Sequence, residues 1–222
     1  MKNLPIILFF SLFHIVAFGQ NIMNSAFDTN GPMGEVLFQQ NENREIVYTG
    51  IIETPYSADT IMGLAREYLY TIEKKYKAKT TGHFDGVTKV ACDVELPVGV
   101  RVLSVGVMGS DDNVGKWTKP ASTVNFNLVI DIRPGKYRYT LTNFVTDRWR
   151  ISGEGKDNGP SNMIHWQRVN SLQKELERAK NKNKEELSAM IEMEKASYQD
   201  EYDAVIKFIE GLKTFAYISD DF

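Results

Sequence analysis

Apolar residues make up 42% and charged residues 25% of the 222-residue chain, proportions that are typical of a globular protein and that exclude global disorder. This length is sufficient for one sizeable core, or for one core with an appendage. The 26 basic and 29 acidic side chains give a formal net charge of −3, which argues against a surface built to hold nucleic acid.

The first 19 residues have the three parts of a secretory signal peptide. Met1–Asn3 is a short basic start, Leu4–Phe18 is an almost unbroken apolar run, and Ala17 and Gly19 are small residues at the two positions that a signal peptidase reads. The run is shorter than the roughly 20 residues of a membrane span, so we expect cleavage before Gln20 and no stable membrane anchor afterwards. The protein is therefore expected to be exported, to the periplasm or the cell exterior of a Gram-negative bacterium.

The N-terminal half of the mature chain predicts one strand followed by one helix. Residues 20–44 are polar and are interpreted as a flexible N-terminus, in which Val36–Phe38 is suited to add an edge strand. Glu45–Glu53 has apolar residues on both alternating faces, which favours a well-covered strand. Over Ala58–Tyr76 the apolar residues recur at helical spacing, and Ser57 is placed to cap that helix.

The next segments are interpreted as a turn, two strands and a loop. Thr80–Gly86 is the turn, and Val87–Val98 and Arg101–Met108 are alternating strands. Gly109–Ala121 is a polar loop that contains Trp117, an aromatic residue suited to contact with a partner.

The single cysteine of the chain, Cys92, excludes an intramolecular disulfide. It shares one face of a predicted strand with Val90, Val94, Leu96 and Val98, so we expect a buried thiol that packs in the core. A nucleophilic role would require a histidine partner.

The strongest pattern in the chain is a β-hairpin over Thr123–Phe144. Apolar residues occupy every second position before Pro134-Gly135, and the pattern resumes after it with Tyr137, Tyr139 and Leu141. Proline fixes the φ angle that a tight turn needs, and glycine accepts a positive φ, so the chain reverses at this dipeptide.

The C-terminal third is expected to contain a linker and two helices. Ile151–Asn162 is rich in glycine and has no apolar residue after Ile151, which is typical of a linker. Met163–Lys180 has helical spacing of its apolar residues, and a second helix runs from Asn183 to about Tyr217.

Interleaved charges of both signs surround these helices between Lys174 and Lys195. Two interpretations remain open: a solvated hairpin that folds back on itself, or a coiled-coil-like arm that meets a partner. We assign residues 163–195 to this charged helical arm and expect residues 45–150 and 196–217 to form the body of the protein. Removal of Lys174 to Lys195 is expected to leave that body folded.

Three segments resemble a family of exported bacterial proteins known as a domain of unknown function with a TBP-like fold. They are Val47–Leu69, Leu128–Phe144 and Val205–Phe215, and the resemblance covers roughly Glu45 to Phe215. It implies an α+β fold in the order β-α-β4-α, with an antiparallel sheet covered by an N-terminal helix and a long C-terminal helix. The charged insertion departs from this layout. The family has no assigned catalytic residues, so none is carried over to this chain.

No motif of the chain supports an enzyme. After signal cleavage only His83 and His165 remain, and no cysteine or acidic residue is spaced to form a metal site with them. The sequence has neither a phosphate-binding glycine loop nor a Gly-x-Ser-x-Gly elbow. We therefore predict a non-catalytic protein without catalytic, metal-binding or cofactor-binding residues.

Two binding hypotheses remain, and we prefer a module that binds an unknown protein partner. The helical arm and Trp117 are its candidate contacts. The alternative is a small apolar ligand held between the sheet and the C-terminal helix, beside Tyr68, Tyr137 and Tyr139. The same tyrosines could instead fill that space, which the sequence leaves open.

Overall fold

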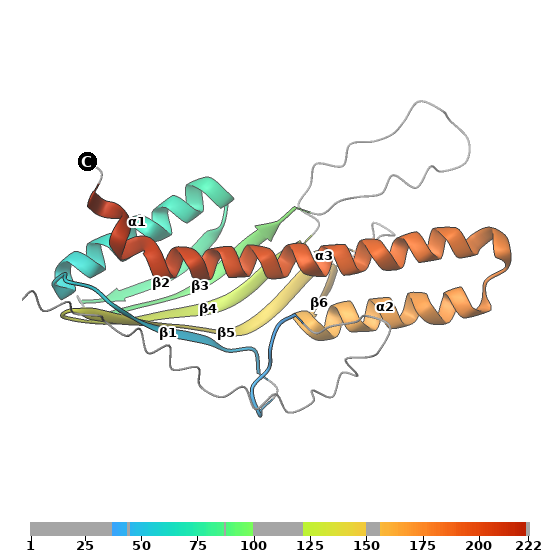
Figure 1. The fold of residues 1–222 in the computed structure, drawn as a ribbon, viewed down its shortest axis with the longest axis horizontal. Helices are drawn as coiled ribbons and strands as arrows, with labels where there is room; N and C mark the ends of the chain where they lie inside the picture. The colour runs from blue at the N-terminus through green and yellow to red at the C-terminus, as the bar shows by residue number, and fades with distance from the viewer. Residues whose placement is uncertain (1–36, 44, 87, 100–121, 150–155, 221–222) are drawn as a thin grey trace, which may run out of the picture.

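The computed structural model describes residues 37–43, 45–86, 88–99, 122–149 and 156–220 (Figure 1). The predicted signal peptide, most of the predicted N-terminal segment, the predicted strand Arg101–Met108 and Trp117 lie outside these residues. In chain order the elements are β1 (Tyr48–Glu53), α1 (Ala58–Tyr76), β2 (Lys79–Asp85), β3 (Lys89–Val98), β4 (Ser122–Arg133), β5 (Lys136–Trp149), β6 (Lys156–Pro160), α2 (Ser161–Arg178), α3 (Asn181–Thr214) and the 3-10 helix η1 (Phe215–Asp220).

The predicted hairpin forms the two longest strands, β4 and β5. Gly135 has a φ of 78°, and Arg133 pairs with Lys136 across the turn, as the Pro134-Gly135 dipeptide predicts. Along β4 every second side chain is buried, so one face of the strand lies in the core. The alternating pattern is therefore confirmed as the centre of the fold.

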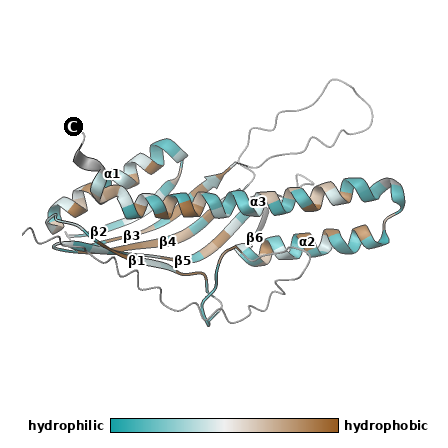
Figure 2. Ribbon diagram, in the orientation of Figure 1, coloured by the Kyte–Doolittle hydropathy of each residue, from teal (hydrophilic) through white to brown (hydrophobic). Residues whose placement is uncertain are grey.

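The described strands form one antiparallel sheet in the order β1-β5-β4-β3-β2, and β6 pairs with the far end of β5. α1 and the C-terminal half of α3 lie on the same face of this sheet (Figure 1). Apolar side chains concentrate on the strands and on the part of α3 that lies over them (Figure 2). This arrangement confirms the α+β class, with helices that cover one face of an antiparallel sheet.

A β-bulge in β5 changes which of its residues face the core. Asn125 pairs with Val145 and Asn127 with Thr142, so β5 has one extra residue between these pairs. Asn143 takes up the extra residue with a φ of 58°. Because of the bulge, Phe144 is buried three residues after Leu141, where strict alternation would place the next buried residue after two.

Two predictions of irregular structure were wrong, because Thr80–Gly86 and Ile151–Asn162 both contribute to strands. The first contains most of β2, in which Gly82 approaches β3 so closely that a Cβ would lie 2.5 Å from Cys92 Cα. The second contains β6, and its last residues, Ser161 and Asn162, are buried in the first turn of α2. Polar residues can form both strands because the backbone of the neighbouring strand, β3 or β5, supplies their hydrogen bonds.

Two predictions for the N-terminal region were also wrong. Phe38 is not part of a flexible segment: it is 0% exposed, and its backbone N–H donates to the hydroxyl of Tyr198 at 3.2 Å. Asn162 donates to the carbonyl oxygen of Phe38 at 2.8 Å, so the segment is held by both α2 and α3. β1 is an edge strand, and Ile51 on its outer face is 66% exposed, so β1 is not covered on both faces.

α2 and α3 form an antiparallel hairpin whose outer end extends beyond the sheet (Figure 1). The predicted break between the helices is confirmed, and α3 begins at Asn181, close to the predicted start. Within the described part of the chain, none of the helices combines the length and the apolarity needed to cross a bilayer.

Gly211 of α3 provides a test of how closely α1 and α3 pack. A Cβ at this position would lie 2.6 Å from Cε2 of Tyr68, whereas a Cβ at Gly63 of α1 would meet nothing within 4 Å. Gly211→Ala is therefore expected to lower the free energy of unfolding by about 1–3 kcal/mol through overpacking. The control Gly63→Ala is expected to raise it by about 0.5–1 kcal/mol, because alanine favours a helix interior over glycine. Urea denaturation followed by circular dichroism measures both values, and a stabilising Gly211→Ala would contradict the packing described.

Candidate functional site

Tyrosine side chains fill the space between the sheet and α3 that the ligand hypothesis assigns to a cavity. Tyr137 is 1% exposed, and its hydroxyl donates to the carbonyl oxygen of Leu212 at 2.7 Å. Tyr68 donates to the carbonyl oxygen of Phe208, also at 2.7 Å. The ring of Phe215 stacks on both tyrosines, with centroids 4.6 Å from Tyr137 and 5.6 Å from Tyr68. These two tyrosines thus bind α3 to the body of the protein.

Tyr139 has a similar packing role on β5. It is 3% exposed and covers Gly50 of β1, where a Cβ would lie 2.5 Å from the Cζ atom of the tyrosine ring. Burial raises the pKa of Tyr68, Tyr137 and Tyr139, so all three hydroxyls stay protonated at neutral pH. The structure therefore brings the three predicted tyrosines together in the core, where they donate hydrogen bonds or pack.

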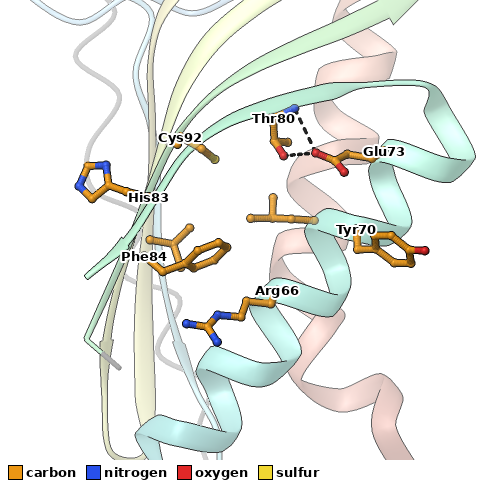
Figure 3. Close-up of a pocket in the computed structure, with 10 residues that line it drawn as sticks. Arg66, Tyr70, Glu73, Thr80, His83, Phe84 and Cys92 are labelled. Carbon is orange, nitrogen blue, oxygen red and sulfur yellow. Dashed lines mark hydrogen bonds between the residues drawn. The ribbon is translucent and has the colours of Figure 1, made fainter. Parts of the chain in front are cut away.

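A groove of about 290 Å³ lies between α1 and the strands β2 and β3 (Figure 3). Glu73 closes one side of it, because its carboxylate accepts a hydrogen bond from the Thr80 N–H at 3.3 Å. On the other side, the guanidinium carbon of Arg66 lies 4.6 Å from the centroid of the Phe84 ring, a cation–π contact. Phe84 and Tyr70 are 44% and 56% exposed. The groove thus presents aromatic rings and a cation to solvent.

The groove has little capacity for nucleophilic chemistry. Burial raises the pKa of the Cys92 thiol to about 11, so this side chain is protonated at neutral pH and is a weak nucleophile. His83 is one of the residues that line the groove, but its side chain points to the other side of β2, away from Cys92 (Figure 3). Cys92 therefore lacks the histidine partner that activation would need, in agreement with the expected packing role.

A buried ionic cluster at the base of the arm joins α2, α3 and the sheet. His165 is 0% exposed, with Glu194 Oε1 2.8 Å from its Nδ1 atom and Glu201 Oε2 2.8 Å from its Nε2 atom. Arg168 donates through Nε to the second oxygen of Glu194 at 3.1 Å. Thr146 of β5 donates to Glu201 at 3.0 Å. We refer to these five residues as the ionic cluster.

The geometry of the ionic cluster favours a protonated His165. Both ring nitrogens face carboxylate oxygens, and an imidazole donates from both nitrogens only when it is positively charged. Burial by itself lowers the pKa of His165, but the charge of Glu201 and the hydrogen bonds with Glu194 and Glu201 together raise it above the usual value. His165 and Arg168 then balance the charges of the two glutamates, so the ionic cluster is neutral overall.

The ionic cluster lies in the interior of the protein. His165, Glu194 and Glu201 are 0%, 1% and 0% exposed. The two carboxylates bind opposite edges of the imidazole and do not converge on one point. Among the described residues, no group of three or more His, Cys, Asp or Glu can hold a metal ion.

The sequence around His165 does not predict this cluster, because the acidic partners of His165 lie far from it in the chain. Glu194 and Glu201 lie 29 and 36 residues further on. A signal was present in α3, where Ile191, Glu194, Tyr198, Glu201 and Val205 follow one another at alternating spacings of three and four. The two glutamates therefore occupy the apolar stripe of the helix, a position that requires a buried partner.

Comparison with known proteins gives similarity at the level of the fold. No family model and no curated protein matches the chain. A solved structure of a DUF4468 family protein from Bacteroides ovatus has a TM-score of 0.50 and 11% identity, covering 84% of this chain and 94% of that chain. A TBP-like protein from Parabacteroides distasonis has a TM-score of 0.47 and 10% identity, covering 83% of this chain and 100% of that chain.

At these identities the likeness concerns the fold alone and gives no activity. The resemblance predicted from the sequence, to a bacterial family of unknown function, is confirmed at the level of the fold by the Bacteroides ovatus structure. The chain therefore shares the antiparallel α+β fold of a DUF4468 family protein.

Proposed function

We propose that the protein is exported and non-catalytic, and that it acts as a protein-interaction module through the outer end of its helical arm. The observation that carries this proposal is the position of residues 174–190, which we call the tip of the arm. The tip belongs to the α2–α3 hairpin and extends beyond the sheet (Figure 1), and none of its described residues is fully buried.

The tip presents a dense and mixed set of charges to solvent. Its exposed charged side chains are Lys174, Glu175, Glu177, Arg178, Lys180, Lys184, Glu185 and Glu186. Leu176 and Leu187 are only half-buried, and the outer turns of both helices are mainly hydrophilic (Figure 2). A mixed-charge helical surface of this kind favours a partner with complementary charges and gives specificity through electrostatic matching.

The base of the arm, in contrast, is rigidly held. The ionic cluster joins α2 to α3 and β5, and Tyr198 donates to the side chain of Asn162 across the same helices at 2.5 Å. A buried ionic cluster rarely stabilises a protein more than apolar packing would, but it fixes one geometry between the elements that it joins. A fixed base with a solvated tip favours an arm that presents its tip to a partner over a hairpin that only folds back on itself.

Deletion of the tip tests this proposal. The limit predicted from the sequence, Lys174 to Lys195, has to be shortened, because Ile191 and Glu194 are 5% and 1% exposed. Replacing Lys174–Met190 by a short glycine linker keeps both residues. We expect a folded protein with nearly the same melting temperature, because few buried apolar contacts are removed.

The functional measurement is affinity capture from the exported fraction of the source cells. The full chain and the shortened chain serve as baits, and calorimetry with the purified captured protein gives its dissociation constant. We expect binding by the full chain and none by the shortened chain. A variant with Lys174→Glu and Lys184→Glu keeps the hairpin and should weaken binding. Equal binding by full and shortened chains, or unfolding of the shortened chain, would reject the proposal.

A further inference from the structure

β2 has an open edge in the described part of the chain. The strand pairs with β3 on one side, and no described strand lies on its other side. Six of its seven residues are exposed, and Thr80 is half-buried. An open edge presents backbone N–H and C=O groups that can pair with another strand. β2 is therefore one edge of the described sheet at which a further strand can be added.

The direction of one amide defines which residues of β2 face outward. The Thr80 N–H donates to Glu73 Oε1 on α1, so this amide points away from β3 (Figure 3). Because outward-facing groups alternate along a strand, the backbone groups of Gly82 and Phe84 also point outward. These three residues would form the hydrogen bonds with an added antiparallel strand.

The sequence of β2 is complementary to itself in an antiparallel arrangement. When Gly82 of one copy lies opposite Gly82 of a second copy, Thr80 lies opposite Phe84, and Lys79 lies opposite Asp85 at both ends. All three outward-facing residues are then in hydrogen-bonded positions. Lys79 and Asp85 fall in the non-hydrogen-bonded positions, where opposite side chains are closest. The alternation of outward-facing backbone groups and the pairing of opposite charges therefore favour the same register.

We propose that two copies of the chain pair through β2 in this register and form a two-fold symmetric dimer with a continuous sheet. Two Lys79–Asp85 contacts flank the pairing, and the two copies of Gly82 at its centre bring no side chains between the strands. The exposed rings of Tyr70 and Phe84 lie beside the same edge, so the dimer would also cover apolar surface. This inference does not rest on the proposed function of the arm, because α2 packs on β5 and β6.

Two contacts within one chain compete with this dimer and are expected to make it weak and concentration-dependent. Lys79 Nζ lies 3.4 Å from Glu95 Oε2, with both side chains mostly exposed. The ammonium group has three donors, so it can also bind Asp85 of the second copy. Glu73 has to release the Thr80 N–H, which then donates to the Phe84 carbonyl oxygen of the second copy.

Charge substitutions at the two ends of β2 test the register. Lys79→Glu places two acidic residues opposite each other at both ends of the dimer, and Asp85→Lys places two basic residues there. Each variant is expected to raise the dimer dissociation constant roughly tenfold or more. An equimolar mixture of the two variants places opposite charges at both ends and is expected to restore dimerisation. Sedimentation velocity over a range of protein concentrations, at low salt, measures the dimerisation of the wild-type chain, of each variant and of the mixture.

Mixing the two variants would not repair a folding defect in either of them, so restored dimerisation in the mixture excludes that explanation. Lys184→Glu on the arm makes the same charge change away from β2 and should leave the dissociation constant unchanged. A wild-type chain that is monomeric at every concentration would overturn the proposal. So would a dimer that neither substitution weakens, or a mixture that dimerises no better than its components.

Discussion

Replacing Glu201 with alanine is expected to lower the free energy of unfolding by about 3–5 kcal/mol. The carboxylate of Glu201 is 0% exposed and contacts His165 Nε2 at 2.8 Å and Thr146 Oγ1 at 3.0 Å. Its removal leaves the positive charge of His165 less well compensated in an interior that water does not reach, and it opens a cavity between α3 and β5. Urea denaturation followed by circular dichroism gives the value.

Glu192 of the same helix provides the matched control. Its side chain is 72% exposed and accepts a hydrogen bond from Lys195 at 3.0 Å. Because exposed ion pairs of this kind contribute little, Glu192→Ala is expected to change the free energy of unfolding by about 0.5 kcal/mol or less. Equal effects of Glu201→Ala and Glu192→Ala would show that the ionic cluster does not stabilise the fold as described.

The protonated state of His165 predicts a loss of stability as the pH rises. The folded protein raises the pKa of His165 above the ordinary value of 6.5, so it retains a proton that the unfolded chain releases. The stabilisation is fully present below pH 6.5 and is lost as the pH rises through the pKa of the folded state. Between these two pKa values the free energy of unfolding is expected to fall by about 1.4 kcal/mol per pH unit.

The pH window and the control for this experiment follow from the other buried groups. Burial raises the pKa of Cys92 from 9.0 to about 11, and this thiol adds its own loss of stability above pH 9.0. Denaturation curves should therefore be compared between pH 6.5 and about pH 8.5. His165→Asn removes the titrating group and is expected to flatten the dependence on pH. Parallel curves for the wild-type and His165→Asn proteins would contradict a protonated His165.

The ionic cluster is a test of the proposal that the protein is not an enzyme. Two carboxylates and an imidazole meet in the interior, which are residue types that many catalytic sites use. Here they are 0–1% exposed, and all of their side-chain N and O atoms except Glu201 Oε1 contact one another, Arg168 or Thr146. The open groove between α1 and the strands β2 and β3 is lined by other residues, among them Cys92, Glu73 and His83. The ionic cluster and the open groove therefore lie in different parts of the molecule.

The hydrogen bonds of two tyrosines distinguish a packed core from the wall of a ligand cavity. Tyr68 and Tyr137 were candidates because aromatic residues at regular spacing suit either a ligand wall or a core. The hydroxyl of each donates to a carbonyl oxygen of α3, which decides for the core. Sequence periodicity indicates only that one face of an element is buried. The element that covers these tyrosines is α3, whose contacting residues lie 75 positions from Tyr137 and 140 positions from Tyr68 in the chain.

The sequence by itself determined the elements that local periodicity encodes. The alternation along β4, the Pro134-Gly135 turn and the helical spacing in α1 each depend on residues that are neighbours in the chain, so the pattern is complete without knowledge of the fold.

Only the tertiary structure decided the features that depend on distant partners. β2 and β6 are polar strands that exist because β3 and β5 supply their hydrogen bonds, and the Asn143 bulge shifts the buried face of β5 by one residue. Glu194 belongs to Lys174–Lys195, whose interleaved charges predicted a solvated stretch, and no role was predicted for Glu201. They are buried because the ring of His165, from another helix, lies between them. The physical reason is the same in each case: a polar group is stable in the interior only when a partner satisfies it, and that partner comes from elsewhere in the chain.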